Sequence, residues 1–461
     1  MRERPAPHNP DCGAELPLER FDDLLSRLLG RVEALPGEMV RLDQLGTEGL
    51  LGRVLAAPLR AVVPHPPSDV SAMDGWAVRA VDLVSATSSE PVTLRCAGDV
   101  AAGGVTTSAV LTTGECRRIA TGATIPRGAD TVVPVERTYL DDPRSGASSL
   151  QRSPLAIPEH VWFTASLDVG SHIRRAGEDM RVGDVLAEVG ALIDAALLSV
   201  IYTSGVSELF LSSRPRVAIL TSGDELTGAA SSSKIRDSNG PALAALALSE
   251  GASVVAVEQV GDNAAATREA VVRLSAMCDL LVTTGGVSVG AHDHVGTALA
   301  SHFELFAWRA AIQPGKPLLL GARRADAASA QFALGVPGNP VSAFVIGMEV
   351  LLPLIRALTG RPAYGVELEG VLEEAVKSPV GRRSFLRLAA LRTPNGDLDR
   401  DQAGRIRVRL AGGQGSHQTA PLAACDALGV ILEEVGELQA GTGIRLHPLS
   451  RATRRIASSN R

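Results

Sequence analysis

The fold is decided by two segments, DLLVTTGGVSVG at residues 279–290 and FALGVPGNPVS at residues 332–342. Each is a short apolar run that ends in a glycine-marked turn, and a helix pattern follows the second turn directly. Apolar runs of this length predict strands that are buried on both faces of a parallel sheet. Ligands of open α/β sheets bind in the crevice at the carboxyl ends of such strands. We therefore expect the functional site beside these two turns.

The sequence around these segments alternates regularly between short apolar runs and helical patterns. Apolar runs occupy 216–221, 252–259, 279–284 and 305–308, and helical patterns occupy 241–250 and 265–277. This alternation predicts βαβ units with right-handed crossovers, and hence a doubly wound parallel sheet. We place this α/β domain at residues 212–362, with a boundary at the Ser-Ser-Arg-Pro segment before residue 216.

The rest of the chain divides into four parts by composition. Residues 1–17 are expected to be a disordered leader, and residues 18–211 a helical part into which a β domain is inserted at about 91–165. Alternating strand-like segments predict a second β domain at 363–450. The basic tail at 451–461 is expected to be disordered.

Composition excludes several classes of protein. The chain has 461 residues with 21% charged residues, as expected for a globular multidomain protein. Its net charge of −6 argues against a nucleic-acid binder. The five cysteines form no C-x-x-C pair, no segment has the pattern of a signal peptide, and the most apolar window, 341–355, is too short to span a bilayer. We expect a cytoplasmic protein that does not enter a membrane.

Acidic residues follow the predicted strands where each of them ends. They are Glu225 after the first strand, Asp262 after the second and Asp293 after the third, and Asp237 precedes a helix. Each of them alone could be a helix cap. Carboxylates that converge on one edge repel each other by about 4 kcal/mol per pair at 4 Å and an effective dielectric constant of 20. Such a cluster indicates a hard cation such as Mg²⁺.

Groups that favour anions are predicted at the same edge. Lys316 lies in a turn between two prolines, and Gly285, Gly286 and Ser288 form the first glycine turn. Backbone N–H groups in such turns suit a phosphate or another oxyanion, although Lys316 alone could equally be a solvated loop residue. Carboxylates for Mg²⁺ and donors for anions together indicate phosphoryl or nucleotidyl chemistry. Spacing alone would make Asp74 only a turn residue.

An ordered set of motifs resembles one known family, the MoeA-type molybdopterin molybdenumtransferases, which includes the E domain of gephyrin. The resemblance covers about residues 18–448. Its motifs are SAMDGWAV (71–78), RIATGA (118–123), RRAGED (174–179), TSGDEL (221–226), TGGVSVG (284–290), PGKP (314–317), PGNPVS (337–342) and GGQGSH (412–417).

The resemblance implies an elongated homodimer in four parts, the last of them a C-terminal β-barrel. It also implies a Mg²⁺-dependent reaction in which adenylylated molybdopterin and molybdate give the molybdenum-loaded pterin and AMP, with a molybdopterin adenylyltransferase as a candidate partner. The positions carried over by motif are Asp74, Thr121, Glu225, Asp262, Asp293, Lys316, Pro337, Pro340 and Ser416. Together with the residues singled out above and Ser342 of the PGNPVS motif, the predicted site consists of catalytic Asp74, Thr121, Asp262, Asp293 and Lys316; substrate-binding Gly285, Gly286, Ser288, Pro337, Pro340, Ser342 and Ser416; and metal-binding Glu225, Asp237, Asp262 and Asp293.

The resemblance further implies that each cleft is shared between subunits. Asp74 and Thr121 of one subunit would face the acidic residues of the α/β domain of the other. Trp76 stands where tyrosine is usual and is expected to keep a stacking surface, and Gln313 stands where lysine is common. Two alternatives remain: an adenylyltransferase, which shares the two turns but has no counterpart of residues 64–79, and a gephyrin-type scaffold. The sequence does not decide between molybdate and tungstate.

Overall fold

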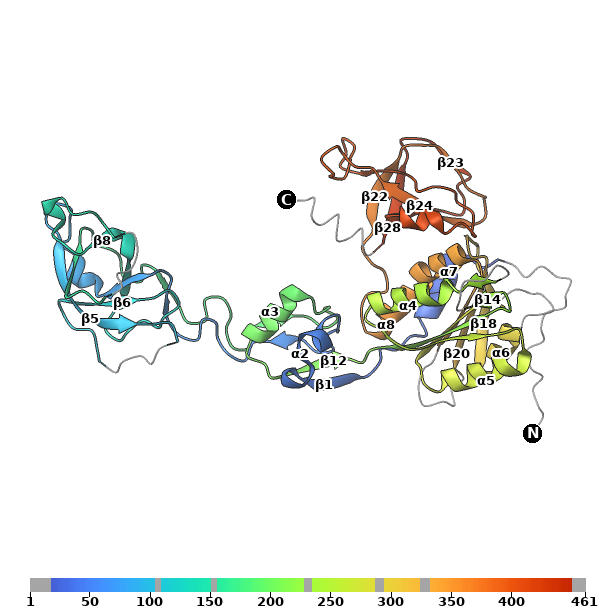
Figure 1. The fold of residues 1–461 in the computed structure, drawn as a ribbon, viewed down its shortest axis with the longest axis horizontal. Helices are drawn as coiled ribbons and strands as arrows, with labels where there is room; N and C mark the ends of the chain where they lie inside the picture. Colours follow the sequence, from blue (N-terminus) through green and yellow to red (C-terminus); the bar gives the residue numbers. More distant parts are fainter. Residues whose placement is uncertain are drawn as a thin grey trace.

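The computed structural model shows an elongated molecule built from four bodies (Figure 1). An α/β domain carries a β-barrel on one side. A small linking body connects the α/β domain to a separate β domain at the far end of the molecule. The structure describes residues 18–103, 109–150, 156–227, 234–286, 294–323 and 332–449.

The α/β domain contains a six-stranded sheet. Its strands, in spatial order, are β16 (Ser253–Val260), β13 (Arg216–Ser222), β17 (Leu280–Thr284), β21 (Phe332–Val336), β20 (Pro317–Arg323) and β18 (Phe303–Arg309). The first four run parallel, which confirms the prediction for both deciding segments. β20 runs antiparallel to both of its neighbours, β21 and β18. β18 therefore has the same direction as the four parallel strands, as expected for the run at 305–308, and β20 is the strand that departs from the parallel pattern. Only residues 310–316 join β18 to β20, and a parallel crossover needs a dozen residues or more.

Helices cover both faces of this sheet. On one face lie α4 (Asn239–Ser249), α7 (Pro340–Ile346), α8 (Leu352–Leu358) and α1 (Phe21–Leu29). On the other face lie α5 (Ala264–Ser275) and α6 (His294–His302). The helix α1 therefore packs in the core of the α/β domain, although it stands at the start of the chain.

The expectation that the apolar window at 341–355 is too short to span a bilayer was wrong, because the helix that contains it continues beyond both ends of the window. The helical segment Pro340–Leu358 is long and apolar enough to cross a membrane, and within the described ranges it is the one segment with this property. Its apolar window is 78% buried inside the protein. The segment is continuous, because a π-helical turn at Gly347–Leu351 joins α7 to α8. Its apolar character is explained by its place in the core between the sheet and α1.

The C-terminal body is a closed barrel of five strands. They are β22 (Leu368–Leu372), β25 (Ile406–Leu410), β24 (Arg383–Ala390), β26 (Ala427–Ile431) and β28 (Gly443–Pro448). The ring closes because β24 pairs with both β25 and β26, while β28 pairs with both β26 and β22. The expected C-terminal barrel is thus confirmed.

Polar contacts fix the barrel to the α/β domain. Arg383 of β24 donates to Asp22 of α1 at 2.6 Å and to Glu433 at 3.2 Å. Nδ1 of His447 lies 2.9 Å from both carboxylate oxygens of Glu349, which is buried in the π-helical turn. The two-residue strand β19 (Ile312–Gln313) also pairs with β24, so Gln313 contributes to this junction.

The linking body is made by two segments that are far apart in the sequence. β1 (Gly37–Arg41) pairs with β12 (Glu208–Ser212), and β2 (Leu59–Arg60) pairs with β11 (Val185–Ala187). The helices α2 (Leu42–Leu50) and α3 (Ala195–Thr203) accompany these strands around a small apolar core. The chain therefore passes through this body twice, on its way to the far β domain and on its return.

The far β domain is built on a second six-stranded sheet. Its spatial order is β7 (Thr131–Pro134), β4 (Gly75–Val78), β6 (Glu115–Ile119), β5 (Val92–Val100), β9 (His160–Phe163) and β8 (Thr138–Tyr139). The sheet includes β4, which lies before the expected start of the inserted domain at about residue 91. Trp76 of β4 is completely buried and donates to Thr138 Oγ1 at 3.0 Å. The expectation of a stacking surface at Trp76 was therefore wrong, because the indole belongs to the core.

Candidate functional site

The carboxyl ends of the four parallel strands meet at one edge of the α/β sheet. The register pairs Ser222 with Val260, and it pairs Thr284 with both Thr221 and Val336. The loops that leave these strands must therefore begin side by side. This alignment places the glycine turn after β17 next to the Pro337–Pro340 turn after β21.

The acidic loops after β13 and β16 are tied to each other. The Asp262 N–H donates to Asp224 Oδ1 at 3.1 Å, and the Asp224 N–H donates to Asp262 Oδ2 at 3.4 Å. The carboxylate of Glu225 folds back over Gly223, where an added Cβ would lie 2.4 Å from Glu225 Oε2. Asp224, Glu225 and Asp262 are all exposed. Two neighbouring strands thus present carboxylates to solvent at the predicted edge.

Asp237 has a local structural role at this edge. Its Oδ1 accepts from the N–H groups of Asn239 and Gly240, at 2.9 and 3.0 Å, at the start of α4. This is the helix-capping interaction that any one of these acidic residues could make. One oxygen of Asp237 is thus committed to α4.

Gly285 holds a position that only glycine can occupy without strain. Its φ is +85°, and an added Cβ would lie 2.3 Å from the carbonyl oxygen of Ser222. Its N–H donates to Val336 O at 3.2 Å, and a Cβ added at Gly338 would lie 3.7 Å from Gly285 Cα. The close approach of three backbone segments therefore depends on Gly285.

Asn239, to which the sequence analysis gave no role, joins the turns of this site. Its Nδ2 donates to Thr284 Oγ1 at 2.8 Å and to Gly338 O at 2.9 Å. Only 9% of the residue is exposed, and its Oδ1 has no hydrogen-bond partner within the described ranges. Asn239 therefore fixes α4 to the ends of β17 and β21. In the sequence, an Asp-Ser-Asn segment before a helix is a typical cap, which hides this tertiary role.

Lys316 reaches the same edge through the antiparallel hairpin. β20 begins at Pro317, and Leu319 pairs with Gly335 near the carboxyl end of β21. Lys316 thus lies just beyond the end of β21 and is half-buried. The one cation predicted for the site therefore lies at the edge that carries the glycine and proline turns.

The barrel also contributes to this edge. The N–H of Val341, in the first turn of α7, donates to the carbonyl oxygen of Ser416 at 3.0 Å. The loop that carries Ser416 is held by the fully buried Arg387, whose guanidinium donates to Gly413 O at 2.6 Å and to Gly415 O at 3.3 Å. Burial lowers the pKa of Arg387. Arg387 was not identified from the sequence, since nothing in the strand pattern of 383–390 distinguishes it.

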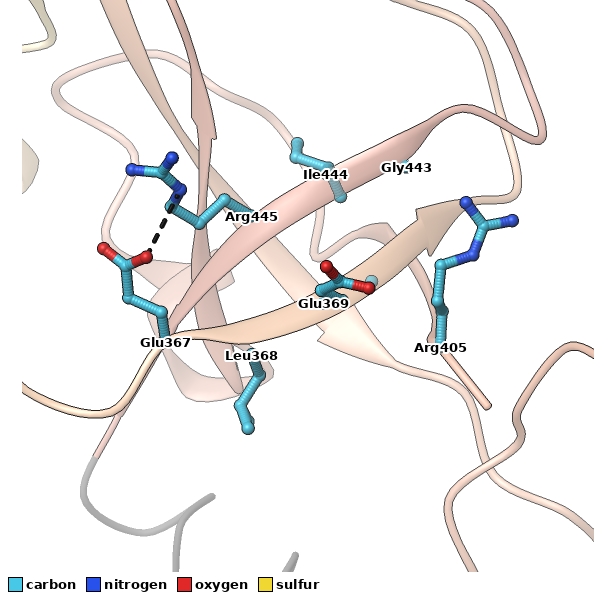
Figure 2. Close-up of a pocket in the computed structure, with 8 residues that line it drawn as sticks. Glu367, Leu368, Glu369, Arg405, Gly443, Ile444 and Arg445 are labelled. Carbon is cyan, nitrogen blue, oxygen red and sulfur yellow. Dashed lines mark ion pairs between the residues drawn. The ribbon is translucent and has the colours of Figure 1, made fainter. Parts of the chain in front are cut away.

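A groove in the barrel lies apart from this edge. It has a volume of about 480 Å³ and is lined by residues of β22 and β28 together with Arg405 (Figure 2). Three of its four charged groups are already paired: Glu367 Oε2 lies 3.4 Å from Arg445 Nε, and Arg405 lies 2.7 Å from Asp401. We therefore do not assign the function to this groove.

Asp74 and Thr121 form a separate pair in the far β domain. Asp74 Oδ1 accepts from the Thr121 N–H at 2.7 Å and from Thr121 Oγ1 at 2.9 Å, and both residues are exposed. Asp74 immediately precedes β4, and Thr121 follows β6. Figure 1 shows β6 at the opposite end of the molecule from α4 and β20. Within one chain this pair does not meet the edge that carries Asp262.

Comparison with known proteins identifies the family. Three family models match consecutive parts of the chain: "MoeA N-terminal region (domain I and II)" at 19–205, "Probable molybdopterin binding domain" at 218–357 and "MoeA C-terminal region (domain IV)" at 369–449. Molybdopterin molybdenumtransferase 2 of Mycobacterium tuberculosis is 34% identical over 410 residues, which cover 87% of this chain and 93% of that protein. The chain belongs to the MoeA family. It is therefore a member of a family of transferases.

Other relatives agree with this assignment. The molybdopterin molybdenumtransferase of Haemophilus influenzae is 30% identical over 441 residues, which cover 93% of this chain and 98% of that protein. The fold matches a crystal structure of a molybdopterin biosynthesis MoeA protein from Pyrococcus horikoshii OT3. That match has a TM-score of 0.73 at 22% identity and covers 94% of this chain and 100% of the other. The likeness to this archaeal structure shows that the fold is that of MoeA proteins.

The site positions expected of a MoeA protein fall into three groups in this structure. One group lies together at the sheet edge and consists of Glu225, Asp237, Asp262, Gly285, Gly286, Lys316, Pro337, Pro340, Ser342 and Ser416. The second group is the distant pair of Asp74 and Thr121. The third group, Ser288 and Asp293, lies outside the described residues. Within the described ranges no three His, Cys, Asp or Glu side chains form a metal-binding group, so the magnesium ligands stay a prediction.

Proposed function

We propose that this protein transfers molybdenum from molybdate to adenylylated molybdopterin and releases AMP, as a step in molybdenum cofactor biosynthesis. The observation that carries the proposal is the convergence of Asp262, the Gly285 turn, the Pro337–Pro340 turn and the Ser416 loop in a chain of the MoeA family. Both substrates are anionic, so the site must offset negative charge and also hold a phosphate that will be released as AMP.

The residues at the edge divide this work between them. Lys316 supplies a positive charge beside the turns, and the glycine turn at Gly285 leaves room for the substrate to approach the backbone. The Ser416 loop closes the edge on the barrel side through its contact with Val341. A substrate held between these groups would have its phosphate beside the exposed carboxylates of Asp262 and Glu225. The negative charges of the phosphate and of these carboxylates would then oppose binding unless a cation lay between them.

Magnesium fits this arrangement. Mg²⁺ in proteins is commonly bound by one or two carboxylates together with water and substrate phosphates, so it does not require a cluster of three protein ligands. Asp262 and Glu225 would hold it, because both carboxylates are exposed and lie on neighbouring loops. When bound, the ion would neutralise charge on the phosphate. Asp237, with one oxygen free of the α4 cap, and Asp293 complete the predicted set.

We also propose that the working form is a homodimer with two shared clefts, located in the cytoplasm. Figure 1 shows β6, which leads to Thr121, at the opposite end of the molecule from α4 and β20, and this arrangement supports a site built from two subunits. An exposed apolar face on the linking body supports a partner surface. There Met39 of β1 and Phe210 of β12 pair across the two strands and are 62% and 39% exposed.

The reaction is tested by mixing the purified protein with adenylylated molybdopterin, molybdate and Mg²⁺ and measuring AMP. We expect AMP release that stops in excess chelator and in Asp262→Asn. The control is Asp43→Asn, which should retain activity. Asp43 lies on α2 of the linking body, and its exposed carboxylate pairs with Arg41 at the end of β1. Full turnover in chelator would contradict the role of the cation. If the protein instead adenylylates molybdopterin from ATP and releases no AMP from the adenylylated form, the proposed reaction is wrong.

The shared cleft is tested with two inactive variants, Asp74→Asn and Asp262→Asn, unfolded and reassembled together. Random assembly makes about half of the dimers mixed, and each mixed dimer would contain one cleft with both substitutions and one with neither. About a quarter of the wild-type activity should then return. If a pulldown with differently tagged chains proves that mixed dimers formed and no activity returns, each cleft belongs to a single chain.

A further inference from the structure

Two cysteines lie side by side in the far β domain. The strands β5 and β6 run parallel, and their register pairs Cys96 directly with Cys116. Both side chains point into the same apolar core, where Cys116 is fully buried and Cys96 is half-buried. Register neighbours on adjacent strands are about 5 Å apart, which lies within the Cα separation of about 4.4–6.8 Å that a disulfide spans. The two free thiols are thus placed for a covalent bond between them.

The surroundings activate one thiol of this pair. A hydrogen bond with the Cys116 thiol lowers the pKa of Cys96 to about 6, against the opposing effect of burial, and the Gly98 carbonyl and the charge of Arg118 lie nearby. The same bond, together with burial, raises the pKa of Cys116. Both shifts favour the thiolate on Cys96 and the thiol on Cys116. A thiolate is the nucleophilic form of cysteine, and Cys96 is also the more exposed of the two.

We propose that Cys96 and Cys116 form a peroxide-sensitive dithiol that closes to an intramolecular disulfide between β5 and β6. The Cys96 thiolate attacks one oxygen of hydrogen peroxide, the O–O bond breaks, and hydroxide leaves to take up a proton, which gives a sulfenic acid on Cys96. The Cys116 thiol then attacks the sulfur of that sulfenic acid. An S–S bond forms and water leaves. The two thiols lose two electrons in total, and peroxide is reduced to two waters.

The remaining described cysteines are placed differently. Cys278 lies at the end of α5 in the α/β domain, and Cys425 lies in the barrel, so neither can reach the pair without unfolding. Burial raises the pKa of Cys278 to about 11, so its thiol stays protonated. A disulfide at the β5–β6 pair would form in the strand that leads to Thr121, because β6 ends at Ile119. The inference concerns this chain's own thiols and does not depend on the proposed reaction.

The test uses the reduced full-length protein, treated with one equivalent of hydrogen peroxide and then unfolded for thiol counting and mass spectrometry. The wild-type protein is expected to lose two of its five thiols and about 2 Da, and the non-reducing peptide map should join Cys96 to Cys116. A dithiol reductant should restore all five thiols. The matched control Cys278→Ser should lose two thiols as the wild type does.

Two variants separate the roles of the pair. Cys96→Ser removes the nucleophile and should lose no thiols, and its half-buried position makes it the variant that best keeps the fold. Cys116→Ser leaves a sulfenic acid without its partner, which a 1,3-dione probe should trap on Cys96. The inference is overturned if the wild type keeps all five thiols, if the map joins other cysteines, or if Cys96→Ser still loses two thiols. The last two outcomes decide the question even if Cys116→Ser does not fold.

Discussion

Replacing Asn239 by alanine should destabilise the junction of α4 with the turns after β17 and β21. The substitution removes the hydrogen bonds from Nδ2 to Thr284 Oγ1 and to Gly338 O, at 2.8 and 2.9 Å. A neutral hydrogen bond contributes about 1 kcal/mol, and a buried polar atom left without a partner costs about 1–3 kcal/mol. Gly338 O and Thr284 Oγ1 would both lose a donor. We therefore expect the α4–β17–β21 junction to be destabilised by about 2–4 kcal/mol.

Hydrogen exchange is the appropriate measurement, because a multidomain chain does not unfold in one step. A loss of about 2–4 kcal/mol in local stability corresponds to exchange that is roughly 30- to 700-fold faster. The increase should appear in peptides that cover α4 and the end of β17. Asn263→Ala is the matched control, because the Asn263 side chain caps α5 by accepting from Ala265 and Ala266, and within the described ranges it forms no hydrogen bond to β17. Its effect should stay within α5.

A double-mutant cycle with Thr284→Val tests the reasoning directly. The two residues share a hydrogen bond, so their effects on exchange should be non-additive by about 1 kcal/mol. Additive effects would mean that the 2.8 Å contact carries no energy. An Asn239→Ala protein whose exchange at β17 matches that of Asn263→Ala would refute the assignment of Asn239 as the residue that joins the turns.

Three further predictions concern other parts of the structure. Gly285→Ala should lower the local stability around its own turn, measured by amide exchange, by about 2 kcal/mol more than Gly146→Ala lowers it around Gly146 in the far β domain, because both glycines have positive φ but only an added Cβ at Gly285 would meet backbone. Arg387→Met should speed amide exchange in 412–418 by about tenfold or more, since hydrogen bonds to a charged group contribute about 1.5–3 kcal/mol each, and Arg387→Lys should restore part of the protection. Burial lowers the pKa of His447, but its hydrogen bond and charge interaction with Glu349 outweigh burial and raise the pKa above 6.5. The His447–Glu349 pair therefore stabilises the protein fully below pH 6.5, and this stabilisation is lost as the pH rises through the pKa of His447 in the folded protein. The Tm difference between wild type and His447→Gln should shrink from pH 6 to pH 9. A Tm difference that stays constant over this range would contradict the role of the pair.

The sequence predicted the parts of the fold that depend on local pattern. The buried runs at Leu280–Thr284 and Phe332–Val336 and the turns after them lie where periodicity placed them. The run at 305–308 is β18, whose direction is the one that the βαβ pattern predicted. β20 was not predicted from the sequence, and its direction is reversed because the connection at 310–316 is too short for a crossover.

Residues that act through tertiary contacts were harder to predict. Asn239 has the sequence context of a cap, and Arg387 lies in an ordinary strand pattern, so neither could be recognised before the elements were assembled. Trp76 shows the opposite error. Tryptophan stands where tyrosine is usual in the motif at 71–78, and it was expected to offer a stacking surface. The indole instead fills the core of the far β domain. The resemblance alone placed Asp74 and Thr121 in the same cleft, and the hydrogen bonds between them, across 47 residues of sequence, became visible only in the structure.

The position of α1 constrains the order in which this chain can fold during synthesis. α1 leaves the ribosome before the residues against which it packs. These partners include Val217, Leu354 and Phe385, which are synthesised much later. The sheet of the far β domain uses residues 75–163. This domain can therefore complete its core before the packing partners of α1 have been synthesised. Contacts over so long a sequence separation form slowly. Until those partners are made, the apolar face of α1, formed by Phe21, Leu24, Leu25 and Leu28, stays exposed and could bind a chaperone. Truncated chains that end before β13 should therefore leave this face of α1 unprotected.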